Sequence, residues 1–152
     1  MPFAKKPAKA AYMWRDIARR AEAYGLTPML PAPYPLDNLA LANQVALVGM
    51  REGWGKAYVI ETYRSWFEQG EPAGSEPNLS QSLAAVGQDP DRVIAQAESD
   101  EGIAALAAET AEAVRLGLFG VPAFVVEGEL FWGDDRLDDA ISWAREGRVI
   151  LS

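Results

Sequence analysis

The chain has 152 residues, of which 49% are hydrophobic, and its formal net charge at pH 7 is −8. This length is enough for one domain with its own core, and the hydrophobic fraction argues against a disordered chain. The acidic balance disfavours nucleic acid and anionic membranes as partners, because both are bound by basic patches. No apolar run is long enough to span a bilayer and no signal-peptide core is present, so we expect a soluble cytoplasmic protein.

Two residue types are absent from the sequence, cysteine and histidine. Without cysteine there is no disulfide, thiol nucleophile or Cys-x-x-Cys redox pair. Without histidine there is no imidazole base and no imidazole ligand for a metal, and we expect no metal site. A protein disulfide oxidoreductase is therefore excluded. Any acid–base chemistry falls to Asp, Glu, Lys, Tyr, Ser or a bound cofactor.

The first three quarters of the chain are predicted to be helical. Apolar residues at helical spacing predict a first helix over residues 7–24, and four prolines between residues 26 and 35 predict an extended connector. Asp37 or Asn38 is expected to cap the next helix. Further helices are predicted over residues 39–51, 56–67, 80–86, 89–98 and 100–115, with Asp89-Pro90 opening the fifth helix. The aromatic residues Tyr63, Trp66 and Phe67 are expected in the core rather than in a ligand cage.

The stretch from Gly117 to Arg136 predicts a hairpin followed by a helix. Residues 123–126 and 130–132 are apolar and prone to form strands, and Glu127-Gly128 between them signals a turn. Asp134 or Asp135 is expected to cap a last helix over residues 136–144, followed by a loose tail over 145–152. The prediction is a single domain, mainly α with one β-hairpin. Residues 8–115 form its helical region, and residues 116–145 form a C-terminal β-β-α unit.

Two motifs give the chain a family resemblance. The sequence Phe-Gly-Val-Pro from Phe119, the hairpin, and Leu-Phe-Trp-Gly-x-Asp-Arg from Leu130 resemble the C-terminal part of the 2-hydroxychromene-2-carboxylate isomerases. These are relatives of the kappa-class glutathione transferases and of DsbA-like thioredoxin-fold proteins. The segment Pro-Ala-Lys-Ala-Ala-Tyr-Met-Trp-Arg-Asp from Pro7 resembles the opening of their helical domain. The resemblance covers nearly all of this chain but only the later part of a family member. It implies the helical domain plus C-terminal β-β-α of a kappa/DsbA-like thioredoxin fold, N-terminally truncated by the loss of a β-α-β unit.

The resemblance also implies a glutathione site. In the family the proline is cis and the residue before it offers its backbone to the peptide part of glutathione, which places Val121 and Pro122 there and predicts a cis bond between them. Asp135 matches the residue that binds the γ-glutamyl end, with Asp134 as a neighbouring contact, and Lys9 matches a lysine that contacts glutathione. The residues alone equally allow a structural role: a solvated lysine in a first turn, and aspartates that only cap a helix.

The family activity is glutathione-dependent isomerisation of 2-hydroxychromene-2-carboxylate, a small aromatic carboxylate met in the degradation of aromatic compounds. Asp37 and Asn38 replace the family's Asn and hydroxyl residue, which puts any substrate contact there in doubt. No residue matches the family serine that binds the glutathione thiol, so no catalytic residue is assigned and we expect little or no isomerase activity. Two alternatives stay open: a non-catalytic truncated remnant acting by self-association or partner binding, and a kappa-type glutathione transferase. An incomplete sheet favours a homodimer.

Overall fold

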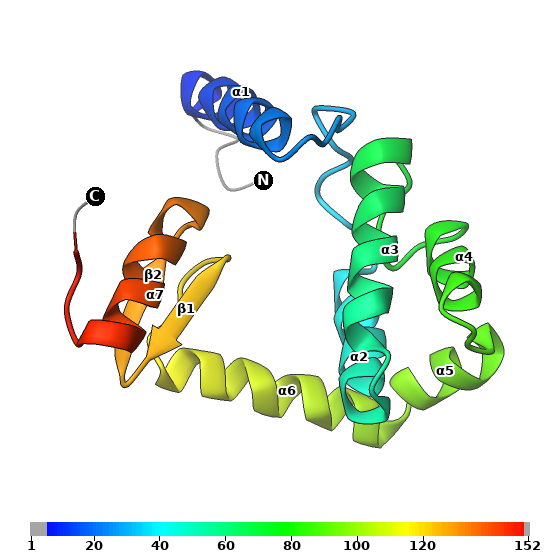
Figure 1. The fold of residues 1–152 in the computed structure, drawn as a ribbon. Helices are drawn as coiled ribbons and strands as arrows, with labels where there is room; N and C mark the ends of the chain where they lie inside the picture. Colours follow the sequence, from blue (N-terminus) through cyan, green and yellow to red (C-terminus); the bar gives the residue numbers. More distant parts are fainter. Residues whose placement is uncertain (1–5, 151–152) are drawn as a thin grey trace. The chain divides into compact units, whose positions relative to one another are not determined.

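The computed structural model describes residues 6–150 and divides the chain into two compact units, Met1–Leu106 and Ala107–Ser152. The elements in chain order are α1 (Pro7–Ala23), α2 (Leu39–Glu52), α3 (Gly55–Gln69), α4 (Asn78–Ala85), α5 (Pro90–Ala97), α6 (Asp100–Arg115), β1 (Ala123–Val126), β2 (Glu129–Trp132), the 3-10 turn η1 (Asp134–Arg136) and α7 (Leu137–Glu146) (Figure 1). The boundary between the units falls within α6. No helix in residues 6–150 combines the length and the apolar character needed to cross a membrane.

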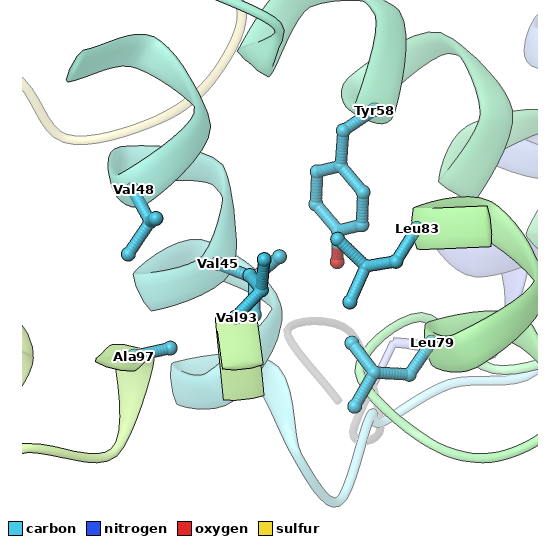
Figure 2. Packing of buried hydrophobic residues seen from close by; sticks show 7 residues of the cluster. All are labelled: Val45, Val48, Tyr58, Leu79, Leu83, Val93 and Ala97. Atoms are coloured by element: carbon cyan, nitrogen blue, oxygen red, sulfur yellow. The ribbon is translucent and has the colours of Figure 1, made fainter. Parts of the chain in front are cut away.

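The core of the first unit lies among four helices. α2 packs against α3 and α5, and α4 packs against α3 and α5. Their inward faces carry the buried apolar cluster shown in Figure 2: Val45, Val48, Tyr58, Leu79, Leu83, Val93 and Ala97. Burying a side chain of this size stabilises the fold by roughly 1.5–3 kcal/mol. The cluster therefore holds together helices that the sequence separates by about fifty residues, counting from Val45 to Ala97.

Glycines let α2 and α3 approach closely. A Cβ atom added to Gly49 would lie 2.7 Å from the Cα atom of Gly55, and one added to Gly55 would lie 2.5 Å from the backbone nitrogen of Met50. Gly53 between the two helices has φ 91°, the left-handed conformation that ends α2. A side chain at Gly49 or Gly55 would push the two helices apart.

Buried Asn78 links α3, α4 and the loop between them. Its side-chain oxygen accepts hydrogen bonds from the Thr62 hydroxyl at 2.7 Å and the Ser82 hydroxyl at 3.0 Å. Its side-chain nitrogen donates to the carbonyls of Thr62 at 3.0 Å and Glu71 at 2.8 Å. All of its hydrogen-bonding capacity is thus used, as burial of an amide requires.

A second polar cluster joins the end of α2 to α5. Arg92 donates to both carboxylate oxygens of Glu52, each at 3.0 Å, and the Trp54 indole nitrogen donates to the same carboxylate at 2.8 Å. The hydrogen bonds from Arg92 and Trp54 lower the pKa of Glu52 from 4.5 to about 2. We call Glu52, Trp54 and Arg92 the α2–α5 clasp.

The second unit is built on the antiparallel hairpin β1–β2, with Ala123 opposite Trp132 and Val126 opposite Glu129. Glu127 and Gly128 form the turn with φ 51° and 88°, the positive values that a tight two-residue hairpin turn requires. α7 packs on the hairpin, where the Phe131 and Trp143 rings lie 6.0 Å apart.

The structure confirms the mainly helical architecture with one hairpin. Asp89 caps α5 as predicted, because its carboxylate accepts from the backbone nitrogens of Asp91 and Arg92. The predicted capping by Asp37 or Asn38 is wrong: Asn38 occupies the N-cap position of α2, but its side chain donates to the Ser75 hydroxyl at 3.3 Å instead.

Three further expectations are corrected. Asp134 and Asp135 do not cap the last helix, because they lie in η1 and the N-cap position of α7 is Arg136. The tail is not loose as far as Ile150, because the Ser142 hydroxyl bonds the backbone of Arg148 and Ile150. Three aromatic residues of α3 that were expected in the core lie outside it: Tyr63 is 51% exposed, and Trp66 and Phe67 are only partly buried.

Candidate functional site

The loop between α6 and β1 is held against β2. Gly117, with φ 76°, turns the chain out of α6, and the backbone nitrogen of Leu118 donates to the Ala113 carbonyl at 2.9 Å. The rings of Phe119 and Trp132 lie 5.0 Å apart. A Cβ atom on Gly120 would lie 2.6 Å from the Trp132 indole nitrogen, so only glycine allows this approach.

Val121 is highly accessible in this loop. The residue is 86% exposed, and the Val121-Pro122 bond is cis, as predicted. The Pro122 carbonyl accepts from the Gly133 backbone nitrogen at 3.0 Å, which continues the pairing of the hairpin by one step. Within residues 6–150, the backbone N–H and C=O of Val121 make no hydrogen bond. They are therefore open to an extended ligand.

The turn η1 carries the acidic part of the site. The Asp135 carboxylate lies 3.3 Å from one terminal nitrogen of Arg136, whose other terminal nitrogen lies 2.9 Å from the Asp139 carboxylate. The hydrogen bond with Asp139 and the nearby charge of Asp135 raise the pKa of Arg136 above its ordinary value. The Asp135 side chain is 67% exposed, so it can accept a ligand cation from solvent.

Four of the five predicted site residues lie in the second unit. Val121 and Pro122 precede β1, while Asp134 and Asp135 follow β2, and the bond between Pro122 and Gly133 joins these two segments at one end of the hairpin. Lys9 lies exposed in the first turn of α1, in the first unit, and its role stays a prediction.

Three residues of this region were not assigned from the sequence. Arg136 holds Asp135 and Asp139, and its place in the Gly-x-Asp-Arg motif was the available signal. Phe119 and Trp132 form the ring pair beside Val121. Gly120 between Phe119 and Val121 was a weak indication of a close approach, but nothing in the sequence named Trp132 as its neighbour.

Val121 and Asp135 are the residues of this end of the hairpin whose fit to a ligand can be examined. In the part of the chain that the structure describes, no group of three or more Asp or Glu side chains is placed to hold a metal. An extended peptide with a free ammonium group finds unpaired backbone groups at Val121 and an exposed carboxylate at Asp135, at the same end of the hairpin. These residues therefore fit a glutathione molecule.

Comparison with known proteins agrees with this fold. Residues 1–141 match the DSBA-like thioredoxin domain. The chain is 27% identical over 130 residues to a 2-hydroxychromene-2-carboxylate isomerase of Sphingobium xenophagum, which covers 86% of this chain and 65% of that protein. A solved structure of a 2-hydroxychromene-2-carboxylate isomerase superposes with a TM-score of 0.76 at 25% identity, covering 86% of this chain and 63% of that one. The chain thus spans slightly less than two thirds of these relatives, and it belongs to the DSBA-like thioredoxin domain family.

Proposed function

We propose that this chain provides the glutathione-binding part of a glutathione-dependent isomerase that acts on 2-hydroxychromene-2-carboxylate or a similar aromatic carboxylate. The observation that carries the proposal is the exposed residue Val121, whose backbone makes no hydrogen bond within residues 6–150, at the hairpin end that also bears Asp135. The isomerase of Sphingobium xenophagum supports it, because the likeness extends over 86% of this chain.

The backbone of Val121 would bind the peptide part of glutathione. An extended peptide adds to an open strand edge through backbone hydrogen bonds, which give affinity without requiring a particular side chain. Pro122 cannot donate, and its carbonyl is already bonded to Gly133. Val121 is therefore the residue at this position that can both donate to and accept from the ligand. When bound, glutathione supplies a thiol that adds reversibly to the conjugated substrate.

Asp135 would bind the ammonium group at the γ-glutamyl end. In the free protein it shares Arg136 with Asp139, and the Arg136–Asp139 contact is the shorter of the two at 2.9 Å. Asp135 can therefore turn to the ligand while Arg136 keeps a carboxylate partner. Asp134 and Lys9 are assigned further contacts to glutathione as part of the same proposal.

Calorimetric titration of residues 1–152 with glutathione tests this assignment. Asp135→Asn should weaken binding by about ten- to a hundredfold, since a hydrogen bond to a charged group contributes roughly 1.5–3 kcal/mol. Its melting temperature should change little, because the Asp135 side chain is exposed. Asp138→Asn is the matched control: it removes an acidic side chain in the first turn of α7 and should leave the affinity unchanged.

Cysteinylglycine, which lacks the γ-glutamyl group, separates the contact made by Asp135 from the contact made by the Val121 backbone. It should bind the Asp135→Asn variant and the unaltered chain equally. A variant that loses thermal stability while retaining its affinity for glutathione would show that Asp135 is a structural residue only.

A further inference from the structure

A cavity of about 400 Å³ lies within the first unit, between α1, the proline-rich connector and α3. α1 contributes Ile17 and Ala21 to its wall, and the connector contributes Leu26 and Pro28. This volume is within the range of small-molecule sites, which are mostly apolar clefts of roughly 300–1,000 Å³.

The α3 side of the cavity is aromatic and firmly held. Tyr63 and Phe67 line it, with ring centroids 5.8 Å apart and planes inclined by 28°. Trp66 packs on Phe67 at 4.6 Å and donates from its indole nitrogen to the Pro33 carbonyl at 2.9 Å. The backbone nitrogen of Met29 donates to the Phe67 carbonyl at 2.6 Å. The connector is thereby tied to α3, so this aromatic surface is fixed before any ligand arrives.

Charge near the cavity disfavours an anionic ligand. Arg64 and Glu68 are the charged residues that line it. Arg64 is already paired with Glu61 at 2.7 Å. The side chains of Arg64, Glu61 and Glu68 together therefore carry one net negative charge. An incoming carboxylate would compete with Glu61 for Arg64 and would approach the negative charge of Glu68, and both effects oppose binding.

We propose that this cavity binds an uncharged, planar aromatic molecule of about the size of indole. Most of the cavity wall is apolar, so an apolar ligand bound there removes apolar surface from water. The Tyr63 and Phe67 rings offer a surface for offset or edge contacts with a flat ligand. The inference does not depend on the proposed isomerase function, because every residue in it belongs to the first unit and glutathione takes no part.

The test is calorimetric titration of the full 152-residue chain with indole in the absence of glutathione. Indole should bind saturably, and indole-3-carboxylate should bind more weakly because of the negative charge beside Arg64. Ala21→Phe, which fills the cavity from α1, should abolish indole binding. Ala23→Phe adds the same side chain two residues further along α1, at an exposed position outside the lining, and should bind indole as the unaltered chain does.

Circular dichroism establishes whether each variant is folded. If Ala21→Phe does not fold, Ile60→Trp fills the same cavity from α3 and carries the same expectation. Absence of saturable indole binding to the unaltered chain, or equal binding by the Ala21→Phe and Ala23→Phe variants, would overturn the proposal. A third outcome would also overturn it: the unaltered chain is a dimer that does not bind indole, and Ala21→Phe converts it to a monomer. In that case a second copy of the chain would fill the cavity.

Discussion

Two buried polar side chains of the first unit, Asn78 and Tyr58, differ in how burial is compensated. Asn78 makes four hydrogen bonds to Thr62, Ser82 and Glu71. The Tyr58 hydroxyl is fully buried, makes no hydrogen bond within the described residues, and points into the apolar cluster (Figure 2). Burial raises the pKa of Tyr58 to about 12, against the opposing effect of the nearby Thr62 hydroxyl, which donates its own hydrogen to Asn78. An unpaired buried hydroxyl is destabilising, whereas a fully paired amide is not.

Tyr58→Phe is therefore expected to increase the free energy of unfolding, by on the order of 1 kcal/mol, because it removes the unpaired hydroxyl and keeps the ring. Urea denaturation monitored by circular dichroism measures this change. Tyr12→Phe, at a position that is 64% exposed, is the control and should have no effect. A loss of stability in the Tyr58→Phe variant would mean that the hydroxyl has a partner after all.

At the same scale, Asn78→Ala should lower the free energy of unfolding by about 2–4 kcal/mol, because it leaves two hydroxyls and two carbonyls of the core without their partner. The same urea denaturation measures it. Ser80→Ala, at the hydroxyl that donates to Glu76 near the surface, is the comparison and should cost much less. Similar losses in the two variants would contradict the role given to Asn78.

At the scale of the elements, the α2–α5 clasp joins two helices through Glu52 and Arg92, which lie forty residues apart in the sequence. The hydrogen bond from Arg92 lowers the pKa of Glu52 to about 2 in the folded protein, from its ordinary value of 4.5. Because the folded value is the lower one, the clasp contributes its full stability above pH 4.5, and that contribution is lost as the pH falls toward about 2. Protonation of Glu52 therefore accounts for part of the stability that the first unit loses in acid.

Glu52→Gln should reduce the difference in stability between pH values above 4.5 and near 2, because the variant no longer has this carboxylate to protonate. Urea midpoints measured across that range report the difference. Glu98→Gln, at the end of α5, is the control and should leave the difference as it is in the unaltered chain. An unchanged pH profile in the Glu52→Gln variant would assign the acid sensitivity to other carboxylates.

Local signals in the sequence predicted most elements correctly. Asp89-Pro90 marks the start of α5, and Glu127-Gly128 marks the hairpin turn, because each feature depends on the conformation of neighbouring residues only. The predicted caps at Asn38 and Asp135 failed because those side chains find distant or charged partners, Ser75 and Arg136. Propensity at one position contains no information on such partners.

The candidate site was predictable to the same degree. The motif around Val121 and Pro122 is contiguous, so it could be located in the sequence, and its cis bond is present. The cavity could not be located in the sequence, because its walls come from residues as far apart in the chain as Ile17 and Phe67. The spacing of the apolar residues in α3 also fits a helix that packs in the core. Tyr63 and Phe67 were accordingly assigned to the core, whereas the structure places them on the cavity wall.

For the whole molecule, the relevant fact is that the chain matches 65% of the length of the Sphingobium xenophagum isomerase. The residues proposed to hold glutathione lie within residues 1–141, the part that matches the DSBA-like thioredoxin domain. Binding of glutathione is therefore the function that we propose for residues 1–152.

The most direct test is to compare turnover by residues 1–152 with turnover by the same residues joined to the part of the Sphingobium xenophagum isomerase that lies outside the match. Both proteins are assayed with glutathione and 2-hydroxychromene-2-carboxylate, after calorimetry has established that each binds glutathione. We expect both proteins to bind glutathione and only the extended one to catalyse the isomerisation. Comparable turnover by the two would contradict this expectation, because residues 1–152 would then activate the glutathione thiol without the added part.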